Sequence, residues 1–372
     1  MGEAHKPAEE MNEMPTIPHD YLHRAAFQIL KAAGVPEEEA RIVANHQIKA
    51  NLVGHDSHGI ILLPEYLERI KKGHIVPGAP FEVVRETPTT ARVNGHWGFG
   101  FVVTEKAMRM AIEKTRVHNV AAVTVFHQSH IGRLGAYSTM AAEEGMIGLI
   151  TADSGAGAKA VTPFGGRDRR LGTNPLSIAI PSNLQGPVLL DMATCAVAAG
   201  KIGVARARKE SVPLGWIVDK DGNPTTDPND YYAGGSILPL GGDQGHKGYI
   251  LSFVVEVLSG ILTGMGFGLD RKQWETRHGA EFRHNDGCFI AVFNVDAFYP
   301  LADFKREVTE FAKYVKSSPP AKGFKEVLYP GEIELLTEQK RRKEGVPIED
   351  ETWGRIAALI KEYGLERVVG KP

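Results

Sequence analysis

The segment VAAVTVF at residues 120–126 decides the fold class, because an apolar run rich in β-branched residues is typical of a buried strand. A helical pattern at 102–115 precedes this segment. A second helical pattern at 135–144 and a second apolar run, MIGLITA at 146–152, follow it. Strand and helix therefore alternate through the middle of the chain, which predicts an α/β fold.

The same alternation extends in both directions from this segment. Further strands are expected on either side of it, together with two long helices. The expected strands are 81–86, 89–94, 177–180, 188–191, 216–218 and 288–295, and the expected helices are 193–207 and 249–262.

The two ends of the chain have a different periodicity. Apolar residues recur at helical spacing before residue 73 and again after residue 297. We therefore predict a helical domain formed by residues 16–77 and 296–372, with an α/β domain inserted at 78–295. The polar residues 1–15 have no apolar run, so we predict a flexible arm rather than a signal peptide there.

Composition limits the class of protein. The chain has 372 residues, of which 42% are hydrophobic and 24% are charged, and this is the balance of a globular protein large enough for two domains. No stretch approaches the ~20 apolar residues that cross a bilayer. We therefore expect a soluble, cytoplasmic protein with no membrane partner.

Charge and cysteine content narrow the class further. The formal net charge is -2, and the basic run at 340–343 lies between Glu338 and Glu344, so it is predicted to be a solvated helix face. No nucleic-acid partner is expected. The only two cysteines, Cys195 and Cys288, lie among apolar neighbours, which favours buried free thiols in a reducing compartment over a disulfide scaffold.

The short segment HDSHG at residues 55–59 has the densest group of protonatable side chains in the chain. It connects two predicted helices and carries two imidazoles, a carboxylate and a hydroxyl. Histidine exchanges a proton near neutral pH, so the segment is a candidate for acid/base chemistry. The alternative is a structural connection in which Asp56 or Ser57 caps the following helix.

Two glycine-rich stretches resemble nucleotide-binding motifs without meeting their requirements. The segment GAGAKA at 155–160 follows a strand, but TPFGG at 162–166 follows at once and leaves no room for the helix of a Rossmann turn. The segment GDQGHKG at 242–248 lacks the second glycine and the final hydroxyl of a P-loop. Exposed amides and Lys247 at a helix start still make the second stretch a candidate anion site.

Two H-x-x-H pairs, His55 with His58 and His127 with His130, suggest a metal site as an alternative. Both pairs lie on expected loops rather than at i and i+4 of a helix, so no metal ligand is assigned. Asp191 ends an expected strand, where it is either a functional carboxylate or the cap of the next helix.

Six segments, taken together, resemble the malate/L-lactate dehydrogenase family of the non-Rossmann type, which includes ureidoglycolate, sulfolactate, diketogulonate, hydroxycarboxylate and piperideine-carboxylate enzymes. They occur in the family's order at 55–59, 129–135, 163–166 together with 172–176, 190–194, 245–248 and 329–332. The resemblance spans roughly residues 21–365. It implies the family's own α/β (α+β) fold, with a helical domain from both chain ends and an inserted cofactor-binding domain.

The resemblance also implies the activity. Family members use NAD(H) or NADP(H) to interconvert a 2-oxo acid and a 2-hydroxy acid, and some reduce a cyclic imine instead. A small acid is therefore the expected substrate, and the expected assembly is a homodimer or a larger homo-oligomer. A metal-dependent hydrolase or lyase that uses the H-x-x-H pairs stays open as the alternative from a different class.

Site residues follow from the resemblance, position by position. It implies His58 as the general acid, Ser57 as its hydrogen-bonding neighbour and Asp191 as the carboxylate that holds the His58 ring. His130 matches a position that can take the proton-transfer role instead. The residues implied to contact the cofactor are Gly132, Arg133, Leu134, Asn174, Asp191, Met192, Ala193, Thr194, Lys247, Gly331 and Glu332.

The chain departs from the family pattern at one position. Many relatives have an arginine four residues after the motif histidine, where it binds the substrate carboxylate, and this chain has Leu62. In this respect the loop resembles the hydroxycarboxylate dehydrogenase branch, which accepts bulkier 2-oxo acids. We expect another cation, Arg133 or Arg169, to bind the carboxylate of a larger or more apolar substrate.

Overall fold

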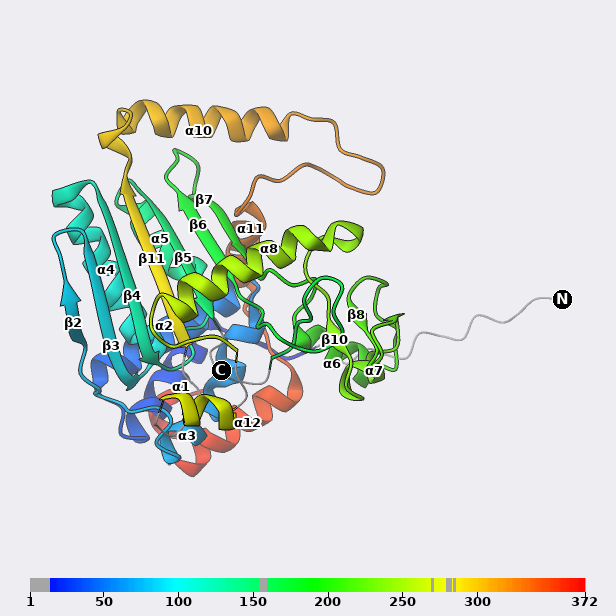
Figure 1. Cartoon of the computed structure of the whole chain (residues 1–372). Helices are drawn as coiled ribbons and strands as arrows, with labels where there is room; N and C mark the ends of the chain where they lie inside the picture. The colour runs from blue at the N-terminus through cyan, green and yellow to red at the C-terminus, as the bar shows by residue number, and fades with distance from the viewer. Residues whose placement is uncertain (1–13, 154–158, 269–270, 279–282, 284–285, 372) are drawn as a thin grey trace.

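The computed structural model describes residues 14–153, 159–268, 271–278, 283 and 286–371, and its centre is a sheet of seven strands (Figure 1). The strand order is β2-β3-β4-β11-β5-β6-β7. Only β3 and β4 pair in parallel, and every other neighbouring pair is antiparallel. The strands are β2 (Glu82–Glu86), β3 (Thr90–Gly98), β4 (Val120–Gln128), β5 (Met146–Asp153), β6 (Leu176–Ile180), β7 (Val188–Met192) and β11 (Asp286–Asn294).

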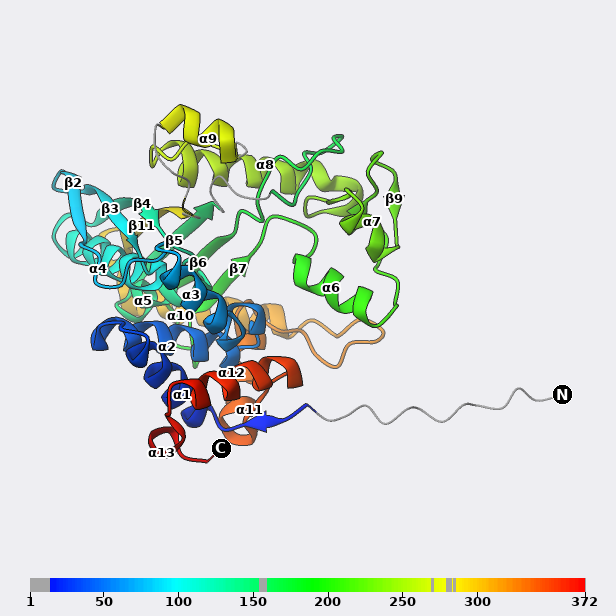
Figure 2. The same cartoon turned by 90° about the horizontal axis from the view of Figure 1, so that it is seen from below.

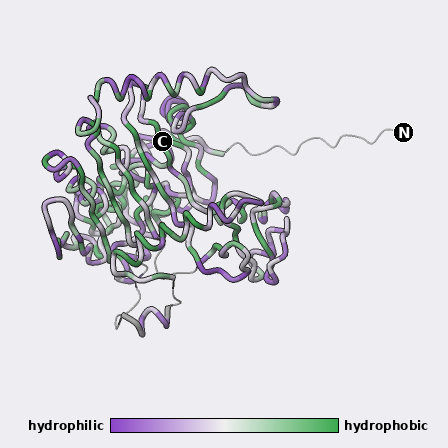
Figure 3. The backbone as a smooth tube through the Cα atoms, turned by 45° about the horizontal axis from the view of Figure 1, so that its top comes forward, coloured by the Kyte–Doolittle hydropathy of each residue, from purple (hydrophilic) through white to green (hydrophobic). Residues whose placement is uncertain are grey.

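The middle of the sheet is a strand from late in the chain. Ile290 of β11 pairs with Val123 of β4 on one side and with Ile150 of β5 on the other. All three side chains are fully buried, and the strands of this sheet are mainly green in the hydropathy view, whereas purple segments lie mostly at the periphery (Figure 3). The apolar runs thus form the core because their side chains are removed from water on both faces.

Helices cover both faces of the sheet (Figures 1 and 2). On one face lie α4 (Gly100–His118), which links β3 to β4, and α5 (Gly135–Glu143), which links β4 to β5. On the other face α8 (Gly245–Glu256) crosses the strands and continues into a π-helical turn, η4 (Val257–Ile261).

Segments from both ends of the chain share a second core beside the sheet (Figure 2). Strand β1 (Thr16–Ile17) pairs with β12 (Val346–Pro347) and brings the ends together. Apolar faces of the helices then pack on one another, as their helical periodicity predicts. These helices are α1 (His19–Ala32), α2 (Glu37–Leu52), α3 (Leu63–Lys71), α12 (Asp350–Glu362) and α13 (Glu366–Val369).

The remaining elements are short or peripheral. A small sheet lies beside α6 and α7, and α10 runs along one end of the central sheet (Figure 1). These elements are η1 (Asp56–His58), η2 (Ile60–Leu62), α6 (Ala199–Ala207), β8 (Ile217–Val218), β9 (Pro224–Thr225), α7 (Pro228–Tyr232), β10 (Ser236–Ile237), η3 (Gly242–Gln244), α9 (Arg271–His278), η5 (Val295–Ala297), α10 (Leu301–Lys316) and α11 (Glu332–Glu344).

The predicted α/β class is confirmed, but two predicted helices are wrong in their bounds. The helix expected at 193–207 begins only at Ala199, because the backbone at 195–196 pairs with 238–239 instead. The helix expected at 249–262 begins four residues earlier, at Gly245. In the described part of the chain no helix is long and apolar enough to cross a bilayer. Residues 1–13 of the arm expected at 1–15, and the stretch 154–158, lie outside the described residues.

Replacing Ile290 with alanine should destabilise the protein strongly. The side chain is fully buried between two neighbouring strands, so a cavity would remain, at a cost of about 2–5 kcal/mol. Thermal unfolding followed by circular dichroism measures the effect. Val117→Ala is the control, because that side chain is 73% exposed. Equal melting temperatures for the two variants would contradict the central place of β11.

Candidate functional site

The loop at residues 55–59 is held by polar contacts to both ends of the chain. Arg341 of α11 donates from Nη1 and Nη2 to the two carboxylate oxygens of Asp56, at 2.7 and 2.9 Å. Asn51 of α2 donates to Asp56 Oδ1 at 2.7 Å and accepts the backbone N–H of Ile60 at 2.9 Å. Asp56 is therefore an anchor that fixes the loop between α2 and α11, not a helix cap.

This anchor corrects the interpretation of the basic run at 340–343. The Arg341 side chain is only 16% exposed, since Asp56 and the backbone of Asn51 hold it. The loop also needs a glycine at its end, because a Cβ on Gly59 would lie 2.2 Å from Asn51 Oδ1. Only part of the basic run is thus a solvated face.

The imidazoles of His58 and His130 form a stacked pair, with ring centroids 5.7 Å apart and planes inclined by 23°. Ser57 Oγ lies 3.0 Å from Nδ1 of His58. Tyr66 of α3 places its hydroxyl 2.7 Å from Nδ1 of His130. The structure therefore brings together two of the predicted catalytic residues, which are 72 positions apart in the sequence. Each imidazole also has a hydroxyl partner.

The backbone around His130 is positioned by the start of α4. A Cβ on Gly100 would lie 2.1 Å from the carbonyl oxygen of Ser129 and 2.5 Å from that of His130. Only glycine lets the helix approach the loop this closely. The first turn of α4 is thus packed directly against the backbone that carries the second imidazole.

Desolvation of the half-buried histidine pair favours the uncharged imidazoles. Desolvation, together with the nearby charges of His55 and Arg133, lowers the pKa of His58 to about 4. Desolvation, together with His58 and Arg69, lowers the pKa of His130 to about 3. A negative charge brought next to the pair would raise both pKa values, because it favours the protonated form.

Tyr66 sets the tautomer of His130. Burial raises the pKa of the Tyr66 phenol well above its usual value, so the hydroxyl keeps its proton. Within the described part of the chain, His130 Nδ1 is its one hydrogen-bond partner, and a buried hydroxyl donates to the acceptor it has. The neutral imidazole then carries its own proton on Nε2, the nitrogen that points away from Tyr66.

Asp191 does not hold the His58 ring as expected. Among the described residues it lies against Arg133, with 2.8 Å between Arg133 Nε and Asp191 Oδ2, and both side chains are 6% exposed. They meet at the start of α5, where Gly135 leaves room for them, since a Cβ there would lie 2.4 Å from Asp191 Oδ2. Burial raises the pKa of Asp191 although the Arg133 charge acts against it. Because the next helix starts only at Ala199, the alternative of a helix cap is also wrong.

Several predicted cofactor residues converge on the end of β7. The backbone N–H of Leu189 donates to Pro330 O at 3.0 Å, which brings Gly331 beside the strand that carries Asp191 and Met192. Gly331 has φ 95°, and a Cβ there would meet the Leu189 backbone at 3.1 Å. The segments at 190–194 and 329–332 therefore lie side by side, as a shared binding site requires.

Asn174 is joined to the same region. Its Nδ2 donates to Glu256 Oε2 at 2.8 Å and to Ser252 O at 3.0 Å, and its carbonyl oxygen accepts from Thr194 Oγ1 at 3.0 Å. It takes φ 41°, a conformation that asparagine tolerates better than most residues. Its side chain is thus committed to α8 on one side, while Oδ1 has no described partner.

The polar atoms left without partners fit a nicotinamide dinucleotide. Carboxylate and amide oxygens accept bonds from sugar hydroxyls and carboxamides, and buried groups of this kind are normally bonded. Lys247, in the first turn of α8, makes no ion pair with a described residue. Within the described chain, the buried side-chain atoms near this region that lack a hydrogen bond are Ser129 Oγ, Asn174 Oδ1, Ser252 Oγ and Glu334 Oε2, whereas Arg133 Nε and Asp191 Oδ2 are joined to each other by the 2.8 Å ion pair.

Other predicted residues have contacts that restrict their roles. Glu332 is paired with Lys316 and accepts the backbone N–H of Tyr329 at 3.1 Å, so its carboxylate is already used. Leu134 and Thr194 are buried. The remaining predicted contacts, which are Gly132, Met192 and Ala193, lie in the loop before α5 and at the end of β7.

Arg169, one of two cations expected to bind substrate, has a structural role instead. It donates to the backbone carbonyls of Gly235 and Tyr231 and lies 4.3 Å above the Tyr231 ring. These contacts hold the segment that carries Arg169 against α7 and against the residue that precedes β10. The expectation for Arg169 is therefore wrong.

A second buried charged group escaped sequence analysis. Lys159 lies 3.3 Å from Asp153 and 3.4 Å from Glu256, and all three side chains are less than a tenth exposed. Burial raises the pKa of Asp153 to about 6 and that of Asp286, at the start of β11, to about 7. No sequence spacing links these residues, because two different strands, a helix and the loop that carries Lys159 bring them together. Tyr66 was missed for a different reason, since tyrosine on an apolar helix face looks like core.

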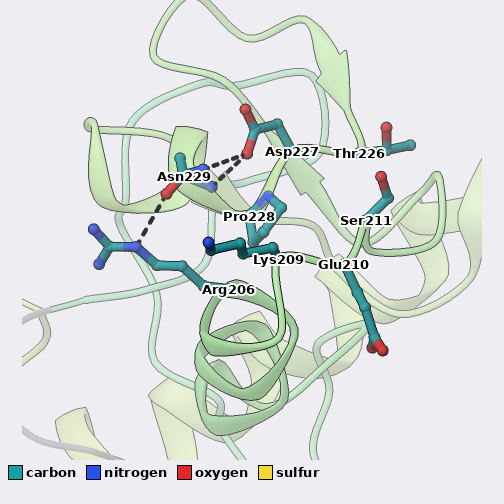
Figure 4. Close-up of a pocket in the computed structure, with 8 residues that line it drawn as sticks. All are labelled: Arg206, Lys209, Glu210, Ser211, Thr226, Asp227, Pro228 and Asn229. Atoms are coloured by element: carbon teal, nitrogen blue, oxygen red, sulfur yellow. Dashed lines mark hydrogen bonds between the residues drawn. The ribbon is translucent and has the colours of Figure 1, made fainter. Parts of the chain in front are cut away.

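A hollow between α6 and α7 is not part of this site (Figure 4). It measures about 530 Å³. Its polar side chains bond one another, since Arg206 donates to Asn229 at 3.0 Å and Asn229 donates to Asp227 at 2.9 Å. None of the predicted site residues lines it. In the described residues, no group of three or more His, Cys, Asp or Glu side chains is arranged to hold a metal ion.

Comparison with known proteins decides the family. The family model described as "Malate/L-lactate dehydrogenase" matches residues 17–357. The chain belongs to the malate/L-lactate dehydrogenase family. The resemblance drawn from the six segments is thereby confirmed, and so is the prediction of an oxidoreductase that acts on hydroxy acids.

Individual family members align over nearly the full chain. A malate/(S)-sulfolactate dehydrogenase from Methanothermus fervidus is 40% identical over 91% of this chain and 96% of its own length. The structure of malate dehydrogenase from Entamoeba histolytica superposes with a TM-score of 0.88 at 33% identity, covering 95% of this chain and 99% of that one. A delta1-piperideine-2-carboxylate reductase from Pseudomonas syringae pvar. tomato has a TM-score of 0.78 at 28% identity, covering 93% and 99%. The family implies a nicotinamide cofactor and a small acid as substrate.

The half-buried neutral histidine pair should make stability depend on pH. The folded pKa values of about 4 and 3 lie below the ordinary value of about 6.5, so the unfolded state binds more protons between those limits. The pair's contribution is complete above pH ~6.5 and is lost as the pH falls toward 4. The raised carboxyl pKa values of Asp153 and Asp286 act in the opposite direction.

Comparison of the wild type with His58→Asn/His130→Asn isolates the histidine contribution, because the carboxyl contributions cancel. Urea unfolding from pH 7 to pH 4.5 should show a shallower loss of stability in the double variant. His118→Asn is the control, since His118 is exposed at the end of α4. The same pH slope in all three proteins would show that the pair is not buried in its neutral form.

Proposed function

We propose that this chain reduces a 2-oxo acid to a 2-hydroxy acid, and catalyses the reverse oxidation, with NAD(H) or NADP(H) as the second substrate. The observation that carries the proposal is the stacked, half-buried pair of His58 and His130, next to Arg133 and so to the strand that carries Asp191. A carbonyl oxygen that gains a hydride at its carbon must gain a proton, and an imidazole supplies it. When bound, the nicotinamide cofactor supplies or accepts the hydride.

We infer that His58 is the acid in reduction and the base in oxidation. The family resemblance implies this role for His58, and desolvation together with His55 and Arg133 lowers its pKa to about 4 in the free protein. The carboxylate of a bound substrate raises this pKa because it favours the imidazolium. Ser57 orients the His58 ring from Nδ1, and His130 flanks it from the side.

Cofactor contacts follow from the unpartnered atoms. We propose that Glu334 accepts a bond from a sugar hydroxyl, and that Lys247 binds the pyrophosphate or a 2'-phosphate. The backbone at Gly331 lines the same region. Glu334 replaces Glu332 in this proposal, because the Glu332 carboxylate is paired with Lys316.

A cyclic imine reductase is the second candidate. The superposition with the piperideine-carboxylate reductase supports it, since both substrates have a carboxylate beside the reduced double bond. The two reactions need the same hydride and proton and differ in the atom that is protonated. Substrate preference therefore distinguishes them.

We also propose a homodimer that uses the outer face of α8 and η4. Monomers rarely expose apolar patches of this extent. The two buried free thiols support a reducing, cytoplasmic location. The apolar side chains that are at least 40% exposed on α8 and η4, or directly after η4, are Ile250, Leu251, Phe253, Val254, Ile261 and Leu262.

The first test is oxidation of NADH and of NADPH, followed at 340 nm, against 2-oxo acids and cyclic imines. We expect turnover with a 2-oxo acid, and the coenzyme that supports it identifies the nucleotide. Faster turnover of the imines would favour the second candidate. Silence with every compound, despite coenzyme binding, would refute both.

Replacing His58 with alanine should lower kcat by about 100-fold or more, because positioned acid/base groups contribute about that much. Coenzyme affinity, measured by NADH fluorescence, should change little. His118→Ala is the control for loss of an exposed imidazole. If His58→Ala keeps its kcat while His130→Ala loses it, the acid is His130.

A further inference from the structure

We propose that Arg69 of α3 binds the carboxylate of the 2-oxo acid and takes over the function of the cation missing at Leu62. The inference rests on the proposed function, because it assigns a contact to that substrate. It commits the chain to a substrate whose carboxylate lies on the α3 side of the histidine pair.

The spacing on α3 puts Arg69 on the face that contacts the pair. Leu62, Tyr66 and Arg69 are separated by four and three residues, so they follow one another along one side of a helix. Leu62 already has helical backbone angles, φ -84° and ψ -11°. Tyr66 in the middle of this row bonds His130. Arg69 therefore lies one turn beyond the contact, and Leu62 lies one turn before it.

The positive charge of Arg69 acts on titratable groups of the candidate site. It is among the causes that lower the pKa of His130, and it is the largest of those that lower the pKa of Asp286. The N–H of Ile131, the residue after His130, also bonds the Asp286 carboxyl. Arg69, His130 and Asp286 thus surround one region at the carboxyl end of β4.

The guanidinium of Arg69 has N–H donors that no described residue accepts. Nε and Nη2 both donate to the same oxygen of Glu65, at 3.0 and 2.6 Å. Glu65 is 49% exposed, so solvent weakens its hold. Nη1 has no partner among the described residues, and the edge formed by Nη1 and Nη2 suits two parallel bonds to a carboxylate.

The other described cations near the pair are already neutralised at close range inside the protein. Arg133 is paired with Asp191, with both side chains 6% exposed. Lys159 is shared between two buried carboxylates. Arg69 is 20% exposed, and its partner Glu65 is exposed to solvent. Among the described cations near the histidine pair, it is therefore the one whose existing ion pair a substrate carboxylate can replace most easily.

Binding at Arg69 also explains how a neutral pair becomes an acid. A carboxylate on the α3 side brings its negative charge next to both imidazoles, which favours their protonated forms. The pair then takes up a proton when the substrate binds, while the free protein keeps it neutral. Leu62, a turn away on the same face, contributes an apolar contact and so favours a side chain without a second charge.

Arg69→Gln tests the proposal. We expect KM for the 2-oxo acid to rise about 10- to 100-fold, the effect of losing a charge-assisted pair of hydrogen bonds, while coenzyme affinity stays within about twofold. Arg69→Lys should recover part of the loss, because lysine keeps the charge without the planar fork. The methyl ester of the same 2-oxo acid lacks the carboxylate, so its kcat/KM should be nearly equal in wild type and Arg69→Gln.

The matched control is Arg109→Gln. Arg109 makes the same pair of bonds to a glutamate four residues earlier, Glu105, but it is 66% exposed on α4. Its KM should equal that of the wild type. Moving the cation, in Arg69→Gln/Leu62→Arg, should restore a low KM, because both positions flank Tyr66 on one face.

The outcomes separate the two proposals. An active wild type whose KM is unchanged by Arg69→Gln would overturn the role of Arg69, and so would an equal loss with the acid and its ester. An inactive wild type with bound coenzyme would instead refute the proposed function. Circular dichroism and coenzyme binding identify a variant that fails to fold, and in that case Arg69→Lys and the double variant decide the question.

Discussion

The bidentate pair of Asp56 with Arg341 is the contact on which the arrangement of the site depends. It ties the loop of His58 to α11, whose residues are nearly 300 positions away in the sequence. Asn51 continues the contact into α2, so three elements are held together at the loop. A charge-assisted contact made by two hydrogen bonds fixes the orientation of the loop as well as its distance from α11. The His58 imidazole therefore keeps a fixed orientation toward His130. Without the pair of Asp56 with Arg341, the loop would keep its contact to α2 through Asn51 but would lose its two-point contact to α11.

A second constraint is the desolvation of the histidine pair. Two imidazoles in contact are more easily buried neutral than charged, and their lowered pKa values show this. Arg133 lies on the side of His58 and Arg69 on the side of His130, and the Asp286 carboxyl, whose pKa is raised to about 7, accepts the backbone N–H of the residue after His130. The two cations suit an anionic ligand. Proton transfer is thereby coupled to substrate binding.

The sequence predicted local structure well where apolar periodicity was strong. The central strands at 120–126 and 146–152 and the helix of 135–144 are present within two residues, because buried β-branched runs and helical spacing leave few alternatives. The helix expected at 193–207 fails where the backbone of Cys195 pairs with the distant Pro239. Small residues at 193–198 favour a helix locally, and a tertiary strand contact overrides that preference. The division into two domains stays a prediction.

The amino-acid sequence by itself determined the fold class, the family and the identity of the two imidazoles, because periodicity and ordered motifs are properties of neighbouring residues. Only the tertiary structure decided which side chains form hydrogen bonds and ion pairs with one another. Asp191 faces Arg133 and not His58, Arg169 holds backbone carbonyls, and Tyr66 bonds His130. Hydrogen bonds and ion pairs of this kind join residues that are far apart in the chain. Their choice depends on which charges burial brings within about 3 Å of each other, and no sequence spacing encodes that distance.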